Sequence, residues 1–353
     1  MAGATGMQGE MAGTGVRIGV IGSGAWGTTL AALAGSAGHD VRLLFRSPDE
    51  ARRVAEDRRH ERAVPGLKLP ESVHPVTRTV DAIAGAALVI LAVPSQVMRE
   101  AARQVAPHVD GAVVLSVSKG IEIASLQRMS QVIGEEFGGF GGRATSTPIA
   151  VLSGPNLSGE IAAGRPTVTL IASADTPAAG RTRDILMGPL FRCYTSADVV
   201  GVELAGALKN VYAIGAGIGA GMEAGENAKA AFITRGIAEM TRLGLAAGAD
   251  AATFAGIAGL GDLIATCSSS GSRNQTLGRH LAAGLSLDDA LARMHHVAEG
   301  VTTTVAARQL GRRLGVDLPI VDQMHAILFE GKKPTAAVAD LMGREPRAES
   351  TGR

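Results

Sequence analysis

Short apolar runs alternate with longer helical patterns over the first two thirds of the chain. The runs are continuous and rich in leucine and β-branched residues, which is typical of parallel strands buried on both faces. They cover residues 16–21, 40–45, 88–93, 113–117, 149–152 and 168–172. Helical patterns at 28–37, 96–105 and 125–137 separate several runs, and a glycine-rich loop at 138–142 interrupts the order. The alternation predicts an α/β fold with a doubly wound sheet.

The pattern becomes helical near residue 195, and no convincing strand follows residue 198. The side chains at 204, 208, 211, 215 and 218 have the spacing of one helix face within residues 202–218. Further helices are expected at 228–247, 274–283, 286–293, 302–314 and 320–329. We therefore predict a doubly wound domain over residues 16–200 and an all-helical domain over 201–343. Residues 1–15 and 344–353 are expected to be a disordered leader and tail.

Composition excludes several classes of function. The 353 residues suffice for two domains, and 34 basic against 33 acidic residues give no electrostatic case for nucleic acid or an anionic membrane. The longest apolar stretch, residues 86–93, is well below the roughly 18 residues of a membrane helix, so no membrane insertion is expected. Two cysteines, Cys193 and Cys267, form no disulfide framework and favour a reduced, cytoplasmic location.

The first fifteen residues contain no basic residue ahead of an apolar core, so they predict no signal peptide. They are interpreted as a leader, or as an upstream start before Met7 or Met11.

A glycine fingerprint follows the first predicted strand directly. Gly22, Gly24 and Gly27 form G-x-G-x-x-G between a strand and a helix, which is the context that this motif requires. The first glycine permits a tight turn, the second lets the backbone approach a pyrophosphate, and the third allows close packing of helix and strand. The helix N-terminus then offers free N–H groups to phosphates. We predict a Rossmann-type dinucleotide-binding domain; the alternative is a glycine-rich turn without a ligand.

The end of the second predicted strand indicates which cofactor binds. An acidic residue there would bind the ribose 2′-hydroxyl of NAD. This chain has Arg46 instead, and a guanidinium matches a 2′-phosphate. NADP or NAD is expected, with NADPH preferred, unless Arg46 is an ordinary solvated arginine.

Two lysines lie where chemistry is expected. Lys119 directly follows an apolar strand, and ligands bind beyond the carboxyl ends of parallel strands. Lys209 lies within an apolar helix, with no charged residue at helical spacing from it. Partial desolvation favours the neutral amine, so Lys209 is a candidate for moving a proton as hydride moves. The alternatives are an ordinary surface lysine at 119 and a side chain at 209 that reaches solvent.

A serine, an arginine and an asparagine mark a predicted helix start. Ser272 is suited to cap a helix that begins near Arg273, and Asn274 follows. N–H groups, a hydroxyl, a guanidinium and an amide would converge on one anion, although a capped helix without a ligand has the same sequence. Asp262, after a glycine-rich loop, is suited to hold Lys209 or a substrate hydroxyl. No histidine–carboxylate set has metal-binding spacing, and the adjacent histidines 295 and 296 would point in different directions on a helix.

Together these residues resemble the bacterial-type NAD(P)-dependent glycerol-3-phosphate dehydrogenases, from about residue 16 to residue 342. The matching stretches are residues 22–27, 93–95, 118–120, 152–155, 203–213, 259–266, 272–274 and 297–300. The resemblance implies a dinucleotide-binding domain followed by a helical substrate domain. It also implies interconversion of dihydroxyacetone phosphate and sn-glycerol 3-phosphate with NAD(P)H, which supplies glycerol phosphate for phospholipid synthesis.

The resemblance also assigns roles to single residues. Lys209 matches the proton acceptor. The expected substrate contacts are Lys119, Gly154, Asp262, Ser272, Arg273 and Asn274. The expected cofactor contacts are Ala25, Trp26, Arg46, Lys119, Ser158, Arg273, Val297 and Glu299.

Two positions depart from the family pattern, and two other functions stay open. Asn156 stands where the family usually has Ser or Thr, and its amide is kept as a substrate contact. Ala25 stands where serine is frequent, so only its backbone can serve the cofactor. The first alternative function is an NADP-dependent dehydrogenase of a β-hydroxy acid or a sugar-acid phosphate. The second is a nucleotide-sensing regulator without turnover. The sequence leaves the oligomeric state open, with a homodimer as one candidate.

Overall fold

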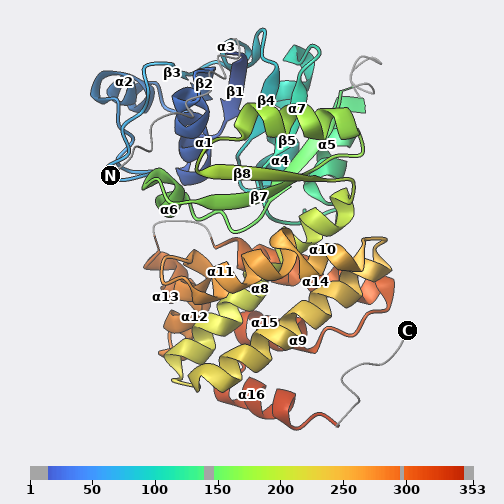
Figure 1. The fold of residues 1–353 in the computed structure, drawn as a ribbon. Helices are drawn as coiled ribbons and strands as arrows, with labels where there is room; N and C mark the ends of the chain where they lie inside the picture. Colours follow the sequence, from blue (N-terminus) through green and yellow to red (C-terminus); the bar gives the residue numbers. More distant parts are fainter. Residues whose placement is uncertain (1–14, 139–146, 295–297, 346–353) are drawn as a thin grey trace, which may run out of the picture.

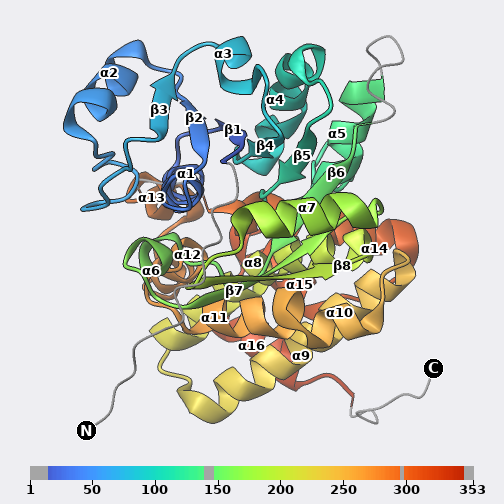
Figure 2. The same ribbon diagram turned by 45° about the horizontal axis from the view of Figure 1, so that its top comes forward.

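The computed structural model describes residues 15–138, 147–294 and 298–345. A sheet-containing part, coloured blue to green, lies against a helical part, coloured yellow to red (Figure 1; Figure 2). Most of the predicted leader, most of the predicted tail and most of the glycine-rich loop at 138–142 lie outside the described residues.

One sheet of eight strands has the order β3-β2-β1-β4-β5-β6-β7-β8. All neighbouring strands are parallel except β6 and β7, which are antiparallel. The strands are β1 Arg17–Ile21, β2 Asp40–Leu44, β3 Val73–Val76, β4 Leu88–Leu91, β5 Val113–Ser116, β6 Ile149–Ser153, β7 Thr167–Ala172 and β8 Phe191–Ser196. The doubly wound α/β class predicted from the sequence is confirmed.

The sequence pattern missed two strands and one strand direction. β3 is short and contains Pro75, and β8 alternates buried with exposed residues, so neither gives a continuous apolar run. The expectation that every run is parallel to its neighbours is wrong for β6 and β7. Their connection contains only α6, Ser158–Ala162, which is too short to cross over the sheet, so the chain returns in the opposite direction.

Helices cover both faces of the sheet. Along β4, Leu88 and Ile90 belong to one apolar cluster, and Val89 and Leu91 belong to the other. This explains why the strand has no polar alternation. The helices of this part are α1 Ala25–Ser36, α2 Pro48–Asp57, α3 Thr79–Ile83, α4 Met98–Val105, α5 Met129–Gly138, α6, and α7 Thr176–Leu186, with 3₁₀ turns η1 Ser95–Val97 and η2 Ala106–His108.

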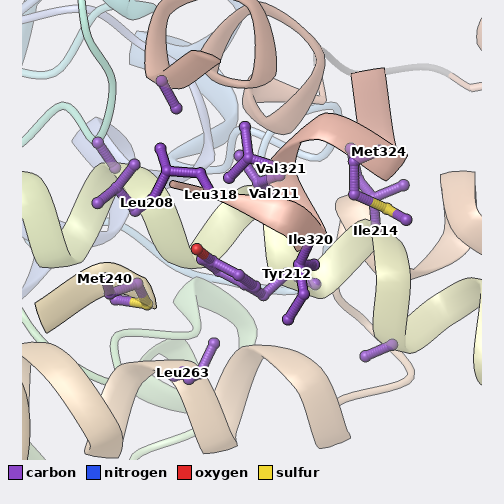
Figure 3. Packing of buried hydrophobic residues seen from close by; sticks show 14 of the residues in the cluster. Leu208, Val211, Tyr212, Ile214, Met240, Leu263, Leu318, Ile320, Val321 and Met324 are labelled. Carbon is purple, nitrogen blue, oxygen red and sulfur yellow. The ribbon is translucent and has the colours of Figure 1, made fainter. Parts of the chain in front are cut away.

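The helical part surrounds α8, Val199–Gly221. The sequence pattern predicted one apolar face, but α8 is buried on all sides from Gly201 to Ile218. Figure 3 shows Leu208, Val211 and Tyr212 of α8 among side chains of the neighbouring helices. α8 is long and apolar enough to cross a membrane, yet 89% of its most apolar window is buried within the protein, as befits a core helix.

The remaining helices are α9 Gly225–Ala246, α10 Ala251–Ala255, the π-helical turn η4 Ile257–Gly261, α11 Asp262–Ser268, α12 Arg273–Ala282, α13 Leu287–Ala292, α14 Glu299–Leu314, α15 Pro319–Phe329 and α16 Pro334–Met342. Most of them contact α8, while α13 packs against α12 and α16 packs against α15. The expected helices of this part are all present, and α10, α11 and α16 were not expected. α8 also contacts β6, so the carboxyl ends of the central strands face the helical part.

Candidate active site

The three glycines of the fingerprint have three different environments. Gly22 has a φ of +115°, and a Cβ there would collide with the carbonyl of Ala92. A Cβ at Gly27 would collide with the carbonyl of Gly22. A Cβ at Gly24 would meet no heavy atom within 4 Å, so the outer side of the turn is open. The turn therefore has the tight bend, the open approach and the close packing that a bound pyrophosphate requires.

The start of α1 fits an anionic ligand. Gly24 caps the helix without a side-chain hydrogen bond, and the first turn contains no acidic residue. The indole nitrogen of Trp26 is buried without a hydrogen-bond partner among the described residues. α6, which begins at Ser158, packs against α1. Free N–H groups and an unpaired indole donor suit a dinucleotide.

Arg46 lies just beyond β2, which pairs with β1 in parallel. Its side chain is exposed, and within the described part of the chain no hydrogen bond or ion pair involves its guanidinium. The next residue, Ser47, caps α2 by accepting a hydrogen bond from the backbone N–H of Glu50 at 3.3 Å. Arg46 is thus placed beside the glycine turn, with its charge available to a ligand.

Two lysines from different parts of the chain share one carboxylate. Lys119, after β5, donates from Nζ to Oδ2 of Asp262 at 2.7 Å, and Lys209 of α8 donates to Oδ1 of the same group. Lys119 also donates to the carbonyl of Gly154 at 2.8 Å, and Lys209 donates to Oγ1 of Thr266 at 2.7 Å. We call Lys119, Lys209 and Asp262 the lysine–aspartate cluster.

The lysine–aspartate cluster is almost removed from water. Lys209 is 6% exposed and Asp262 is 1% exposed. The pKa of Lys119 is lowered to about 8, chiefly by burial and also by the charge of Lys209, while Asp262 opposes both effects. Burial alone would raise the pKa of Asp262, but the two ammonium groups outweigh burial and hold it below its ordinary value. With both lysines charged the cluster carries a net positive charge, which favours an anion or a developing alkoxide.

The charge partner of Lys209 comes from another helix. Its helical neighbours are uncharged, but α11 places Asp262 against it. The expectation that Asp262 holds Lys209 is confirmed as geometry. α8 also lies close to the end of β6. This approach requires a glycine at position 206, because a Cβ there would collide with Oγ of Ser153.

The predicted helix start at Ser272 is confirmed, but its three side chains point differently. Ser272 caps α12 by accepting from the N–H of Gln275. Arg273 is exposed, whereas Asn274 is buried. The amide of Asn274 donates to Oδ1 of Asn210 at 2.9 Å and accepts from the N–H of Gly300 at 3.0 Å. Arg273 and the free N–H groups of α12 can meet an anion, while Asn274 joins three helices.

Asn156 and Glu299 lie near the same site. Oδ1 of Asn156 accepts from Thr169 at 3.2 Å, and its amide nitrogen is buried without a partner among the described residues. Glu299 begins α14 and accepts from Oγ of Ser95 at 2.6 Å, which connects the helical part to the 3₁₀ turn after β4. Val297 and the histidines 295 and 296 lie outside the described residues.

Three residues of the site were not singled out from the sequence pattern. Thr266 lies one helical turn after Asp262, a spacing that would have indicated it. Asn210 follows Lys209, and its amide donates to the carbonyl of Lys119 at 3.2 Å. No sequence signal pairs Ser95 with Glu299, because 204 positions separate them. Within the described ranges, no cluster of three or more potential metal ligands occurs.

Comparisons with known proteins agree with this arrangement. Residues 17–179 match the model of the NAD-dependent glycerol-3-phosphate dehydrogenase N-terminus, and residues 198–339 match that of the C-terminus. A glycerol-3-phosphate dehydrogenase [NAD(P)+] of Syntrophotalea carbinolica is 45% identical over 335 residues, which is 95% of this chain and 99% of the relative. One of Chlorobium phaeobacteroides is 42% identical over 335 residues, with the same coverage.

Solved structures give the same answer. The crystal structure of glycerol-3-phosphate dehydrogenase from Coxiella burnetii has a TM-score of 0.88 and 32% identity, covering 94% of this chain and 99% of that one. A ketopantoate reductase from Ralstonia eutropha, at 18% identity and a TM-score of 0.57 over 91% of this chain and 99% of that one, shares only the fold. The comparisons therefore support the predicted family and not the alternative of another dehydrogenase.

Proposed function

Because this chain belongs to the NAD-dependent glycerol-3-phosphate dehydrogenase family, we propose that it interconverts dihydroxyacetone phosphate and sn-glycerol 3-phosphate with NAD(P)H. The observation that carries the proposal is the buried lysine–aspartate cluster at the carboxyl end of the sheet. Such an enzyme supplies glycerol phosphate for phospholipid synthesis.

The glycine turn and the start of α1 hold the cofactor pyrophosphate in this proposal. The bound nicotinamide supplies or accepts the hydride at C2 of the substrate. Ala25 contributes its backbone, and Trp26, Ser158 and Glu299 are further proposed cofactor contacts; Ser158 begins α6, which packs against α1. Arg46 is proposed to bind a 2′-phosphate, which is the basis of the predicted preference for NADPH.

Lys209 is the proposed proton donor and acceptor. In the direction of reduction its ammonium group gives a proton to the C2 oxygen, so that the alkoxide is neutralised as the new C–H bond forms. In the reverse direction the neutral amine removes the proton from the C2 hydroxyl. Asp262 and Thr266 hold Nζ in place by hydrogen bonds.

Lys119 and Arg273 are proposed to provide fixed positive charge. Lys119 donates a hydrogen bond to Oδ2 of Asp262, and its charge stabilises negative charge that develops on the substrate. The substrate phosphate is assigned to Arg273 and to the free N–H groups at the start of α12, which Ser272 begins. Gly154 and Asn156 are further proposed substrate contacts. Asn274 is proposed to support the phosphate site at the start of α12.

An assay with purified protein tests the proposal. Dihydroxyacetone phosphate and NADPH are mixed with the enzyme, and loss of nicotinamide absorbance is followed. Loss that requires the phosphorylated substrate supports the proposal, and no loss with either NADPH or NADH rejects it. Turnover of an unphosphorylated β-keto acid instead would support the other class of dehydrogenase.

The cellular setting is part of the proposal as well. Cys193 and Cys267 are both free and buried, which suits a reducing compartment, and we place the reaction in the cytoplasm. A homodimer stays a prediction, to be checked by light scattering of the purified protein.

A further inference from the structure

A buried histidine outside the lysine–aspartate cluster contacts the glycine turn. His60 lies in the connection between α2 and β3 and is 5% exposed. Its Nε2 is 2.9 Å from the carbonyl oxygen of Ser23, the residue between the first two glycines of the fingerprint. The contact joins positions 37 residues apart.

The carbonyl of Ser23 receives a second hydrogen bond. Oγ1 of Thr28, in the second turn of α1, donates to it at 3.1 Å, and Thr28 is fully buried. A trans peptide is planar, and its C=O and N–H point in opposite directions. Because two donors hold the carbonyl of Ser23, the N–H of Gly24 in the same peptide points away from them. Gly24 is exposed, and a Cβ built there would meet no heavy atom within 4 Å, so the chain leaves space for a ligand beside this residue.

His60 is itself held in a fixed position. The backbone N–H groups of Ala63 and Val64 both donate to its carbonyl at 2.9 Å. Its ring packs against the ring of Phe45, with centroids 5.3 Å apart, and Phe45 directly precedes Arg46. Burial lowers the pKa of His60, which favours a neutral ring with one N–H. Because a carbonyl only accepts, that N–H is on Nε2.

We propose that His60 is a positioning residue for the cofactor diphosphate. By holding the carbonyl of Ser23 it orients the N–H of Gly24 toward the diphosphate, and its contact with Phe45 links this turn to the strand end that carries Arg46. The proposal rests on the proposed function, in which the turn binds a dinucleotide. Substrate and the lysine–aspartate cluster do not take part in it.

The test measures binding of ADP-ribose, a diphosphate that lacks nicotinamide, to the full-length enzyme by calorimetry. His60→Leu removes the donor and keeps an apolar side chain, and about tenfold weaker binding is expected. The Michaelis constant for NADPH should rise by the same factor, while kcat at saturating NADPH stays within twofold of wild type. His60→Gln retains an N–H donor and should bind within threefold of wild type.

Two further variants keep the test decisive. His108→Leu changes an exposed histidine of η2 and serves as the matched control, with unchanged binding expected. Thr28→Val removes the other donor with little change of shape and tests the same carbonyl if His60→Leu does not fold. Wild-type affinity in folded His60→Leu, or a loss in His60→Gln as large as in His60→Leu, would overturn the proposal. Failure of the wild-type enzyme to bind ADP-ribose would instead reject the dinucleotide site itself.

Discussion

Lys119 and Lys209 donate to different oxygens of one buried carboxylate, that of Asp262. One lysine follows a strand of the sheet and the other lies within the central helix of the helical part. Two cations and one anion leave a net positive charge where solvent is excluded. This relationship gives the two lysines separate roles, since only one of them has to move a proton.

Replacing Lys209 by methionine should remove the proton donor while preserving the apolar stem. We expect kcat to fall roughly 10²- to 10⁴-fold, the usual contribution of general acid–base catalysis. The Kd of NADPH, measured by fluorescence titration, should stay within threefold of wild type. Lys229→Met, on the adjoining helix α9, is the matched control and should leave kcat unchanged. Near-normal turnover of Lys209→Met would exclude this lysine as the proton donor.

Asp262→Asn should leave two buried ammonium groups without their carboxylate. Because that charge opposes the effect of burial on Lys119, its loss should lower the pKa of Lys119 below about 8. We expect kcat/KM to fall at least about tenfold at pH 7. The decrease of kcat/KM at alkaline pH should also begin at a lower pH in the variant than in the wild-type enzyme. A pH–rate profile identical in shape to that of wild type would contradict the shared role of the carboxylate. Asp250→Asn changes an exposed carboxylate and serves as the control.

The pH dependence of the wild-type enzyme follows from the same lysine. Lys119 is cationic below its pKa of about 8 and neutral above it, so charge at the site is lost as the pH rises through 8. kcat/KM for reduction of dihydroxyacetone phosphate should therefore fall above about pH 8. In Lys119→Arg the guanidinium stays protonated, and the decline should move to higher pH even if the rate is reduced. If kcat/KM of Lys119→Arg decreased over the same pH range as in wild type, the decrease would have to come from the titration of another group.

Arg46→Ala should reduce the preference for NADPH over NADH. A charge-assisted hydrogen bond to a phosphate contributes about 1.5–3 kcal/mol, so kcat/KM for NADPH should fall about 10- to 100-fold. kcat/KM for NADH should change less than threefold, because that cofactor lacks the 2′-phosphate. Arg52→Ala, at an exposed position of α2, is the control. Equal losses with both cofactors would show that Arg46 does not recognise the 2′-phosphate.

A buried carboxylate in the helical part should make stability depend on pH. Glu239 is 2% exposed and accepts from the hydroxyl of Tyr212 at 3.1 Å and from the N–H of Ile320 at 2.6 Å. Burial raises its pKa from 4.5 to about 7, while its hydrogen bonds and the charge of Arg242 oppose the rise.

The direction of the effect follows from linkage. The folded protein binds this proton more tightly than the unfolded chain does, so the stabilisation is complete below about pH 4.5 and is lost as the pH rises through 7. The free energy of unfolding should decrease by roughly 2–3 kcal/mol between pH 5 and pH 8 from this group. Glu239→Gln should lack that part of the dependence when both proteins are denatured with urea. An equal pH dependence in the two proteins would show that Glu239 does not titrate in this range.

The doubly wound sheet, the glycine turn and the helix start at Ser272 could all be predicted from the order of the residues. Each depends on local rules: apolar runs, glycines between a strand and a helix, and a capping hydroxyl before a helix. The family was also evident, because its motifs occur in order along the chain. The strands β3 and β8 escaped because a proline and an alternating pattern remove the continuous apolar signal.

The group that compensates the charge of Lys209 and the direction in which Asn274 faces depend on contacts between helices that are far apart in the chain. Asp262 is 53 positions from Lys209, and Asn274 is 64 positions from its partner Asn210. Contacts at such separations arise from the packing of whole helices, which periodicity along one helix does not specify. The same applies to His60, whose contact with Ser23 depends on how the connection after α2 folds back against the turn. Local pattern therefore fixed the elements, and long-range packing fixed the charges and hydrogen bonds of the site.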